Sequence, residues 1–388
     1  MIMPYLSKKT VYRRALNTGE IEIKHQASAY SCDALFDMAE RRNPKRAFLF
    51  VSKVLGRHIP VSPRTMRAVY KQLTAQFPKS IYAVHASPIL FIGMAETAVG
   101  LGAGVFDEMQ SRIPNAIYLT STRHPIPGEL LCEFKESHSH ATDHLLYLPD
   151  NAELRQRVTQ ARTLVLIDDE ATTGNTFMHL IEALSATNKL QHLQQIITIT
   201  LTDWSGNALQ KRCSLPVTCL ALIKGSWHWQ PKPDAAVPTM PAVSLTAAGK
   251  EPITGKQSWG RLGMAAAAND LGRHIKAKKG EKLLVLGSNE FVWEPFLLAE
   301  RLENEGADVK FSSTTRSPIA TGFAIESMIS FSDNYGLGIP NFVYNVAQQQ
   351  LDRILLCVET PVSSVDPLLL RALAKVAPSV EVISYQSN

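Results

Sequence analysis

Short runs of apolar residues recur along the chain without the alternation of apolar and polar positions that marks a half-exposed strand. Such unbroken runs are typical of strands buried on both faces of a parallel sheet. They occur at Ile89–Gly93, Ala116–Thr120, Leu164–Ile167, Ile196–Leu201 and Val217–Ile223. The stretches between several of them have the length of helices. The pattern therefore predicts an α/β fold, with about five parallel strands and helices on both faces of the sheet.

The region before the first of these runs has a more mixed pattern. It predicts an edge strand at 20–24, a helix at 33–42, a strand at 48–52 and a helix from Pro63 to about Phe77. Arg57 and His58 lie between the last two elements. They fit either contact with an anionic ligand or an ordinary surface position.

The composition changes after the last buried run. Residues 230–258 are rich in proline and alanine, which is typical of a linker between domains. The 388 residues are enough for two domains with sizeable cores. We therefore expect a first domain at 25–229, a linker at 230–258 and a second domain at 259–388.

The second domain repeats the first in a degraded form. Residues 286–290 match 92–96, residues 315–319 match 122–126, and residues 355–359 match 164–168, in the same order. A smaller, degenerate Rossmann-like α/β domain is the expected result. The pentapeptide Leu-Gly-Arg-His-Ile also occurs twice, at 55–59 and 271–275, but at a different interval.

The most informative stretch is Leu164–Thr176, where Asp168, Asp169 and a turn of small hydroxyl residues follow a buried run. The carboxyl end of a parallel strand is the edge at which open α/β sheets bind ligands. A turn that leads into a helix offers N–H groups and hydroxyls to a phosphate. Paired carboxylates accept hydrogen bonds from neighbouring sugar hydroxyls. The stretch predicts a sugar-phosphate site, and the alternative is a strand–turn–helix corner with an aspartate cap.

This pattern resembles that of the type I phosphoribosyltransferases, such as orotate phosphoribosyltransferase. The resemblance implies that Asp168 and Asp169 hold the 2′ and 3′ hydroxyls of phosphoribosyl diphosphate during catalysis. It also implies that its 5′-phosphate is wrapped by Glu170, Ala171, Thr172, Thr173, Gly174, Asn175 and Thr176.

The same resemblance gives a role to Met94, Ala95, Glu96 and Thr97, which follow the first core strand. They correspond to the loop whose backbone binds diphosphate. Glu96 departs from the family pattern, because its charge repels diphosphate unless the side chain points away or coordinates magnesium. The other interpretation is that small residues here allow a close contact between helix and sheet.

Between the second and third core strands, the resemblance implies a mobile loop that closes over the reacting centre. Arg123, Lys135, His138 and His140 are its candidates to meet the charge of the leaving diphosphate. For each of them the alternative is a merely solvated position. The His-x-His spacing also fits zinc, but no cysteine or glutamate completes a convincing ligand set.

The segment Thr315-Arg316-Ser317-Pro318 resembles the Thr-Arg-Ser-Pro (TRSP) domain. That domain follows a distinct phosphoribosyltransferase family (PRTase_2) from bacterial gene neighbourhoods associated with tellurium resistance. In this second copy Thr360-Pro361 stands where the first has Asp169 and its turn. Proline removes an N–H donor and the glycine is missing, so we expect poor phosphate binding here. The copy either caps the first site or supplies a dimer-like face.

Composition narrows the partners and the compartment. A net charge of +5, thinly spread, does not favour a nucleic-acid partner. No run reaches the ~18 apolar residues of a membrane span, and the N-terminus lacks the apolar core of a signal peptide. Five scattered cysteines without Cys-x-x-Cys spacing disfavour disulfides and zinc. We expect a cytoplasmic protein with no membrane partner.

Together, the residues and the resemblance predict a phosphoribosyltransferase, a glycosyltransferase (pentosyltransferase) of nucleotide metabolism. It would move the 5-phosphoribosyl group to an unidentified nitrogen base, with Mg²⁺ held mainly by the substrate. Whether it forms a homodimer stays open. Three alternatives remain: a regulator that binds phosphoribosyl diphosphate or a nucleotide, an enzyme like phosphoribosyl diphosphate synthetase, and an N-glycosidic hydrolase or phosphorylase. The synthetase is disfavoured because no separate ATP motif is visible.

Overall fold

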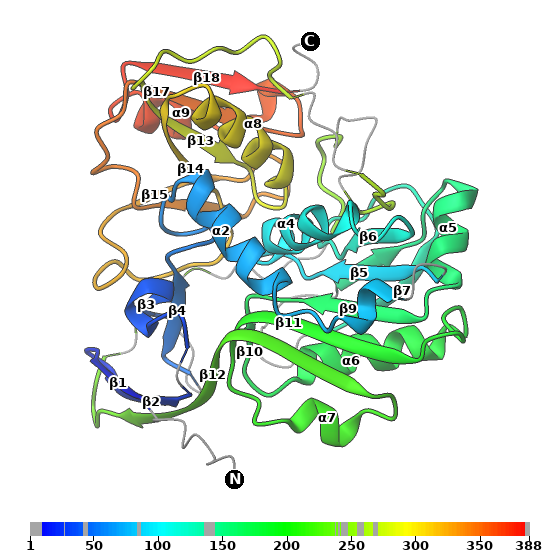
Figure 1. The fold of residues 1–388 in the computed structure, drawn as a ribbon. Coiled ribbons are helices and arrows are strands. Elements are labelled where there is room, and N and C mark those ends of the chain that lie inside the picture. Colours follow the sequence, from blue (N-terminus) through cyan, green and yellow to red (C-terminus); the bar gives the residue numbers. More distant parts are fainter. Residues whose placement is uncertain are drawn as a thin grey trace.

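The structure, a computed structural model, describes residues 10–26, 28–41, 46–83, 87–135, 144–236, 238–239, 241, 247–253, 260–266 and 271–384. Figure 1 shows two α/β units, a larger one whose sheet is cyan and green and a smaller one in yellow to red. We call them the first unit, which contains strands β1 to β12, and the second unit, which contains β13 to β18.

The first unit is built on an eight-stranded sheet. Its parallel strands, in spatial order, are β6 (Ala116–Thr120), β5 (Ile89–Gly93), β9 (Thr163–Ile167), β11 (Gln195–Asp203) and β12 (Val217–Pro231). Every residue of β5, β6 and β9 is buried, as the unbroken apolar runs predict. The five parallel strands are thus confirmed, although β12 runs further than its apolar core. A short strand, β10 (Glu170–Ala171), pairs with β11.

Helices cover both faces of this sheet. The helix α4 (Val99–Gln110) connects β5 to β6 and packs on both strands. In Figure 1, α6 (Asn175–Ala186) and α7 (Ala208–Arg212) lie on the opposite side from α4. Right-handed crossovers that run in opposite directions from the centre of the sheet require this arrangement. The remaining helices are α2 (Pro63–Thr74), which packs on α4, and α3 (Ser80–Ala83) and α5 (Ala152–Thr159).

Antiparallel strands extend the sheet beyond β12. β2 (Gly19–His25) pairs with β12, and β1 (Thr10–Ala15) pairs with β2. The predicted edge strand at 20–24 therefore lies inside the sheet, because β1 covers its free side.

The predicted helix at 33–42 is wrong for most of its length. α1 (Cys32–Leu35) is a single turn, and the chain then forms β3 (Phe36–Glu40), which pairs with β4 (Phe48–Ser52). Tertiary packing outweighs the helical spacing here. On one side of this hairpin Phe36 and Phe48 pack against Trp204 and Trp227, and on the other Ala39 and Val51 contact the second unit.

The second unit has a four-stranded parallel sheet in the order β14–β13–β17–β18. Its elements are β13 (Lys282–Gly287), α8 (Trp293–Asn304), β14 (Asp308–Ser313), β15 (Met328–Ser332), β16 (Pro340–Tyr344), β17 (Arg353–Cys357), a 3₁₀ turn (Val362–Ser364), α9 (Pro367–Leu373) and β18 (Ser379–Ile383).

This unit repeats the central part of the first, as predicted. β14, β13, β17 and β18 occupy the positions of β6, β5, β9 and β11. The antiparallel hairpin β15–β16 follows β14 as β7 (Leu130–Phe134) and β8 (His144–Tyr147) follow β6. Equivalent bridges join Thr122 to Leu145 and Thr315 to Phe342.

The register corrects one match between the copies. Gly93 lies opposite Ile167 and Gly287 lies opposite Cys357. Glu359 is therefore equivalent to Asp169, and not to Asp168 as the sequence match has it. A run of similar apolar side chains offers no landmark, so a shift by one residue is easily made.

Each unit also lends a segment to the edge of the other sheet. Val61, just before α2, bridges Phe311 of β14, and Met264 bridges Tyr118 of β6. Thr120 also donates its N–H to the carbonyl of Gly260. The predicted linker thus leads into a segment that extends the first sheet, and the domain boundaries at 229 and 259 stay predictions.

The two edge segments share a Gly-Arg pair. Gly56 and Gly260 both have positive φ, and a Cβ there would lie 2.6 Å from Phe311 and 2.7 Å from Tyr118, respectively. Gly260-Arg261 is therefore the counterpart of Gly56-Arg57. The second Leu-Gly-Arg-His-Ile, at 271–275, is not.

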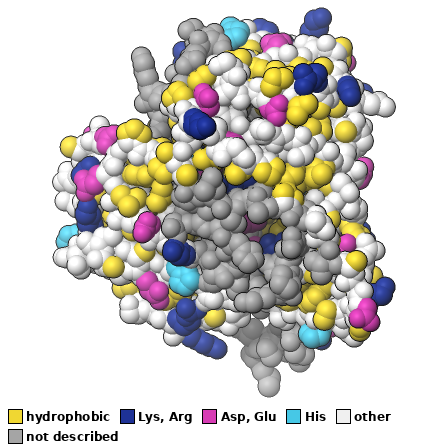
Figure 2. All heavy atoms as spheres, turned by 180° about the vertical axis from the view of Figure 1, so that it is seen from behind, with side chains coloured by type: hydrophobic (Ala, Val, Ile, Leu, Met, Phe, Trp, Pro, Cys, Tyr) yellow, Lys and Arg dark blue, Asp and Glu magenta, His cyan; other side chains and the backbone are white. Residues whose placement is uncertain are grey.

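Figure 2 shows one face of the surface, on which Lys and Arg side chains are dispersed among Asp and Glu. Within the part of the chain that the structure describes, no helix is long and apolar enough to cross a membrane. The five cysteines are free thiols.

Two glycines of α4 are expected to respond to alanine with opposite signs. A Cβ on Gly102 would lie 2.7 Å from the Tyr118 hydroxyl and 2.9 Å from Gly93 Cα, so Gly102→Ala should destabilise the fold by about 1–3 kcal/mol. A Cβ on Gly100 would meet only Val292, at 3.5 Å, so Gly100→Ala should stabilise by about 0.5–1 kcal/mol. Urea unfolding of both variants tests this. Equal effects would contradict the close packing of α4 on β5.

Candidate functional site

Three strands of the first unit end side by side at one edge of the sheet. Gly93 at the end of β5 lies opposite Thr120 of β6 and Ile167 of β9. The segments that follow these strands, 94–97, 121–123 and 168–169, therefore begin next to one another. The fold brings the predicted diphosphate loop, Arg123 and the two aspartates to one edge of the sheet, the edge at which open α/β sheets bind ligands.

Asp168 and Asp169 are held by their backbone at the end of β9. The Asp168 N–H donates to the Ile199 carbonyl at 3.0 Å, and the Leu201 N–H donates to the Asp169 carbonyl at 3.0 Å. The Asp169 N–H also donates to Asp168 Oδ1 at 2.9 Å. Both residues are half-buried. The sheet thus fixes the backbone position of both aspartates, and both residues are partly exposed to solvent.

The predicted phosphate turn, 170–176, leads from β10 into α6. Gly174 directly precedes the helix with φ 75°, a left-handed conformation that favours glycine. The first N–H groups of a helix have no acceptor within it and carry the positive end of its dipole. The turn therefore presents N–H donors next to the hydroxyls of Thr173 and Thr176.

Glu170, the acidic residue of this turn, is paired with a cation that the sequence analysis missed. Arg46 Nη2 lies 2.8 Å from Glu170 Oε2, and Arg46 Nη1 lies 3.2 Å from Thr172 Oγ1. Thr172 Oγ1 in turn donates to Glu170 Oε1 at 2.8 Å. The Arg46 guanidinium also lies over the ring of Phe48, 4.8 Å from its centroid. No local motif marks Arg46, because its polar partners Glu170 and Thr172 are more than a hundred residues away.

Glu96, in the predicted diphosphate loop, lies at the interface of the two units. Its carboxylate contacts Arg57 Nη2 and lies 3.3 Å from Arg316 Nε of the TRSP segment. Only 9% of the Glu96 side chain is exposed, against 3% for Arg57 and 6% for Arg316. Burial lowers the pKa of Arg57 to about 9 and that of Arg316 to about 10, helped by the charge of Arg123.

Arg57 and His58 are therefore buried, and their interpretation as surface residues is wrong. Arg57 Nη1 also donates to Ser313 Oγ at 3.0 Å and to the Asn289 carbonyl, both in the second unit. Burial, reinforced by the charge of Arg57, lowers the pKa of His58 to about 3. His58 is thus neutral at ordinary pH.

The backbone of the same loop is tied to the neighbouring strand ends. The Met94 N–H donates to the Ile167 carbonyl, and the Ala95 N–H donates to Ser121 Oγ at 2.9 Å. Ser121 Oγ is 3.0 Å from Nδ1 of His144, the first residue of β8, and both side chains are fully buried. Ser121 Oγ thus accepts from the Ala95 N–H and also shares a hydrogen bond with His144 Nδ1, whose direction depends on the histidine tautomer. This links the loop to the hairpin that carries the predicted mobile segment.

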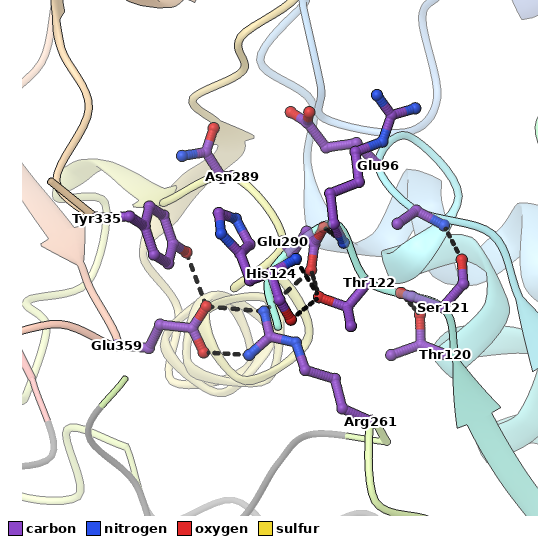
Figure 3. A network of polar contacts seen from close by, with 12 residues as sticks. Glu96, Thr120, Ser121, Thr122, His124, Arg261, Asn289, Glu290, Tyr335 and Glu359 are labelled. Atoms are coloured by element: carbon purple, nitrogen blue, oxygen red, sulfur yellow. Dashed lines mark hydrogen bonds and ion pairs between the residues drawn. The ribbon is translucent and has the colours of Figure 1, made fainter. Parts of the chain in front are cut away.

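Glu290 of the second unit is equivalent to Glu96. It contacts residues of the first unit, as Glu96 contacts Arg316 of the second. Glu290 accepts hydrogen bonds from Thr122 Oγ1 at 2.6 Å and from the Arg123 N–H at 2.8 Å. Arg261 Nη2 lies 3.1 Å away (Figure 3). Burial alone would raise the pKa of Glu290. The charge of protonated His124, the charge of Arg261 and the two hydrogen bonds outweigh it and lower that pKa to about 2. Burial lowers the pKa of His124 itself, so His124 contributes its charge only in acid, whereas Arg261 is charged throughout.

Arg261 also pairs with Glu359, the second copy's equivalent of Asp169. It donates to both oxygens of Glu359, at 2.8 and 2.9 Å, and the Tyr335 hydroxyl donates to the same carboxylate at 2.7 Å (Figure 3). His124 stacks on Tyr335 with ring centroids 4.1 Å apart. The carboxylate in the place of Asp169 is thus satisfied by contacts within the protein. The expected poor phosphate binding of this copy stays a prediction.

The structure places only part of the predicted mobile loop. Arg123 is half-buried at the interface, and the Lys135 carbonyl contacts His179 Nδ1 of α6 at 2.8 Å. His138 and His140 lie outside the described residues. Among the residues that are described, no group of three or more His, Cys, Asp or Glu is placed to hold a metal ion.

Comparison with known proteins follows the same division of the chain. Residues 35–226 match the phosphoribosyl transferase family PRTase_2, and residues 255–373 match the TRSP domain found C-terminal to it. No curated protein matches the chain.

Solved adenine phosphoribosyltransferases are similar to about half of the chain. The enzyme from Rhodothermus marinus is 14% identical, over 49% of this chain and 94% of its own, with a TM-score of 0.32. The enzyme from Giardia lamblia, complexed with 9-deazaadenine, is 18% identical over 50% and 98%, with a TM-score of 0.33. The enzyme from Trypanosoma brucei, in complex with AMP, pyrophosphate and ribose-5-phosphate, is 10% identical over 55% and 86%, with a TM-score of 0.34. Such TM-scores do not bear on the substrate.

The lowered pKa of Glu290 predicts a specific loss of stability in acid. Its carboxylate stabilises the fold fully above the unfolded-state pKa of 4.5, and this contribution is lost as the pH falls towards about 2. The difference in unfolding free energy between wild type and Glu290→Gln should therefore narrow by about 2 kcal/mol between about pH 6 and pH 3. Thr122→Val keeps the carboxylate but removes a donor, so the native-state pKa of Glu290 should rise. The acid-induced loss of stability should then be smaller than in wild type and be complete at a higher pH. Urea titrations with parallel pH profiles for wild type and Glu290→Gln would contradict the assignment.

Proposed function

Since the chain belongs to the phosphoribosyl transferase family that carries a TRSP domain at its C-terminus, we propose that it acts on phosphoribosyl diphosphate. It transfers the 5-phosphoribosyl group to a nitrogen base and releases diphosphate. The observation that carries this proposal is the meeting of three segments at one sheet edge. These are the paired aspartates after β9, the phosphate turn before α6 and the loop after β5.

In this proposal Asp168 and Asp169 hold the ribose. Each carboxylate accepts a hydrogen bond from one of the 2′ and 3′ hydroxyls, which fixes the sugar against the end of β9. As the bond to diphosphate breaks, positive charge develops on the sugar. Carboxylates placed beside it stabilise that charge more in the transition state than in the ground state.

The turn at 170–176 takes the 5′-phosphate. Its N–H groups at the start of α6 and the hydroxyls of Thr173 and Thr176 are donors, which match the phosphate oxygens. Glu170 would oppose this binding, but Arg46 neutralises it at 2.8 Å. The turn therefore fits an anion in spite of its acidic residue.

The protein's own groups fit magnesium held mainly by the substrate. Magnesium prefers oxygen ligands and is often bound through a few carboxylates and substrate phosphates rather than by a protein cage. Asp168 and Asp169 are the half-buried carboxylates at this edge that would contribute. When bound, the ion would neutralise the charge of the departing diphosphate. The free thiols of the chain fit the cytoplasm, where we expect this enzyme to act.

The proposal predicts that the aspartates are needed for binding and not for folding. Isothermal titration with phosphoribosyl diphosphate and Mg²⁺ should show binding to wild type and at least tenfold weaker binding to Asp168→Asn, Asp169→Asn, since two hydrogen-bonded carboxylates are lost. Asp107→Asn is the control, because Asp107 lies on α4 and pairs with Arg67. If the double variant binds as tightly as wild type, the ribose does not bind at Asp168 and Asp169, and the assignment is wrong.

Arg46 is expected to matter only through Glu170. Arg46→Gln should weaken binding of ribose 5-phosphate several-fold, because it leaves a charged carboxylate beside the phosphate turn. Adding Glu170→Gln should restore most of the loss. If the second substitution restores nothing, Arg46 contacts the ligand itself or supports the aromatic cluster, and the neutralising role is wrong.

A further inference from the structure

The diphosphate loop and the second unit meet at a buried concentration of positive charge. Arg57 and Arg316 both face the Glu96 carboxylate, and the charge of Arg123 acts on both guanidinium groups. One carboxylate thus stands between two arginines, with a third nearby. The charge of Glu290 also acts on both guanidinium groups and offsets part of the positive charge, but Glu290 is itself paired with Arg261. Buried like charges repel strongly, so a site of this kind favours an anion with more charge than one carboxylate carries.

The two equivalent glutamates are held very differently. Glu290 is fixed by a hydroxyl, a backbone N–H and Arg261. The described contacts of Glu96 are the ion pairs with Arg57 and Arg316. Guanidinium groups can exchange one anion for another without a change in the backbone, whereas a backbone donor is fixed in place. Glu96 is therefore the displaceable member of the pair.

Two adjacent residues of the second unit have buried polar atoms without partners among the described residues. Ser288 Oγ and Asn289 Oδ1 have no hydrogen-bond partner there, although the two residues are only 2% and 4% exposed. The backbone of Asn289 is next to the charge cluster, because its carbonyl accepts from Arg57 Nη1. Buried polar groups are normally satisfied, so this part of the second unit has hydrogen-bonding capacity that the described residues leave unused.

We propose that Glu96 is a resident anion in a cation site built by both units, with Arg57 from the first and Arg316 from the second, and that the diphosphate group of the substrate replaces it. The TRSP segment thus completes the diphosphate end of the site. Each arginine can bind a phosphate group through two parallel N–H···O hydrogen bonds. Two arginines therefore match the two phosphate groups of diphosphate better than they match a single carboxylate. This inference rests on the proposed function, since it assigns part of the same substrate.

Binding of inorganic diphosphate to the full chain tests the inference by calorimetry. Glu96→Gln removes the competing charge without changing the shape of the side chain, so it should bind diphosphate about tenfold or more tightly than wild type. Arg316→Gln should bind it about tenfold more weakly. Arg353→Gln is the matched control, because Arg353 is a largely buried arginine of the second unit that pairs with Glu281 at the opposite end of β17.

The double variant separates two roles of Arg316. In the Glu96→Gln background, Arg316→Gln should still weaken diphosphate binding. If it has no further effect, Arg316 serves only to neutralise Glu96, and its contact with diphosphate is excluded. Binding to Glu96→Gln that is no tighter than wild type would overturn the inference.

Thermal unfolding covers the case in which Glu96→Gln is unstable. Diphosphate should then raise its melting temperature more than that of wild type, because the anion replaces the missing carboxylate. An equal or smaller rise would count against the inference. If Glu96→Gln behaves as expected but phosphoribosyl diphosphate binds without Asp168 and Asp169, the proposed function fails while the anion site stands.

Discussion

The arrangement of this molecule depends on buried charges that find their partners across the interface of two similar units. Glu96 of the first unit lies among Arg57 and Arg316, and Glu290 of the second binds Thr122, Arg123 and Arg261. A buried charge is costly unless it is paired, and loss of one partner costs several kcal/mol. These contacts therefore favour one relative placement of the two units.

The interface resembles an isologous one, in which both partners use the same surface and each contact occurs twice. Here both partners belong to one chain, and the edge segments around Gly56-Arg57 and Gly260-Arg261 are exchanged as well. The two halves have since taken different roles. In the first, Asp168 and Asp169 stand half-open at the sheet edge. In the second, Arg261 and Tyr335 donate hydrogen bonds to Glu359, the carboxylate equivalent to Asp169. In the proposed function, the first half binds the substrate and the second half supports the site.

Local signals allowed much of the fold to be predicted from sequence. Strands β5, β6 and β9 are unbroken apolar runs, and the turn before α6 contains a glycine where the backbone is left-handed. Contacts between distant residues carried no such signal. β3 has the spacing of a helix but is a strand, because aromatic side chains and the second unit cover both of its faces. Arg46, Arg57 and Arg261 find their partners only in the folded chain.

The central claim is transfer of a phosphoribosyl group, and release of diphosphate in the presence of a base tests it most directly. The full chain would be incubated with phosphoribosyl diphosphate, Mg²⁺ and a panel of purine and pyrimidine bases, and both products would be measured. We predict that one base or class of bases gives diphosphate and a phosphoribosylated base in equal amounts. Binding of phosphoribosyl diphosphate without release for any base, or release that needs no base, would contradict the account and favour a sensor or a hydrolase, respectively.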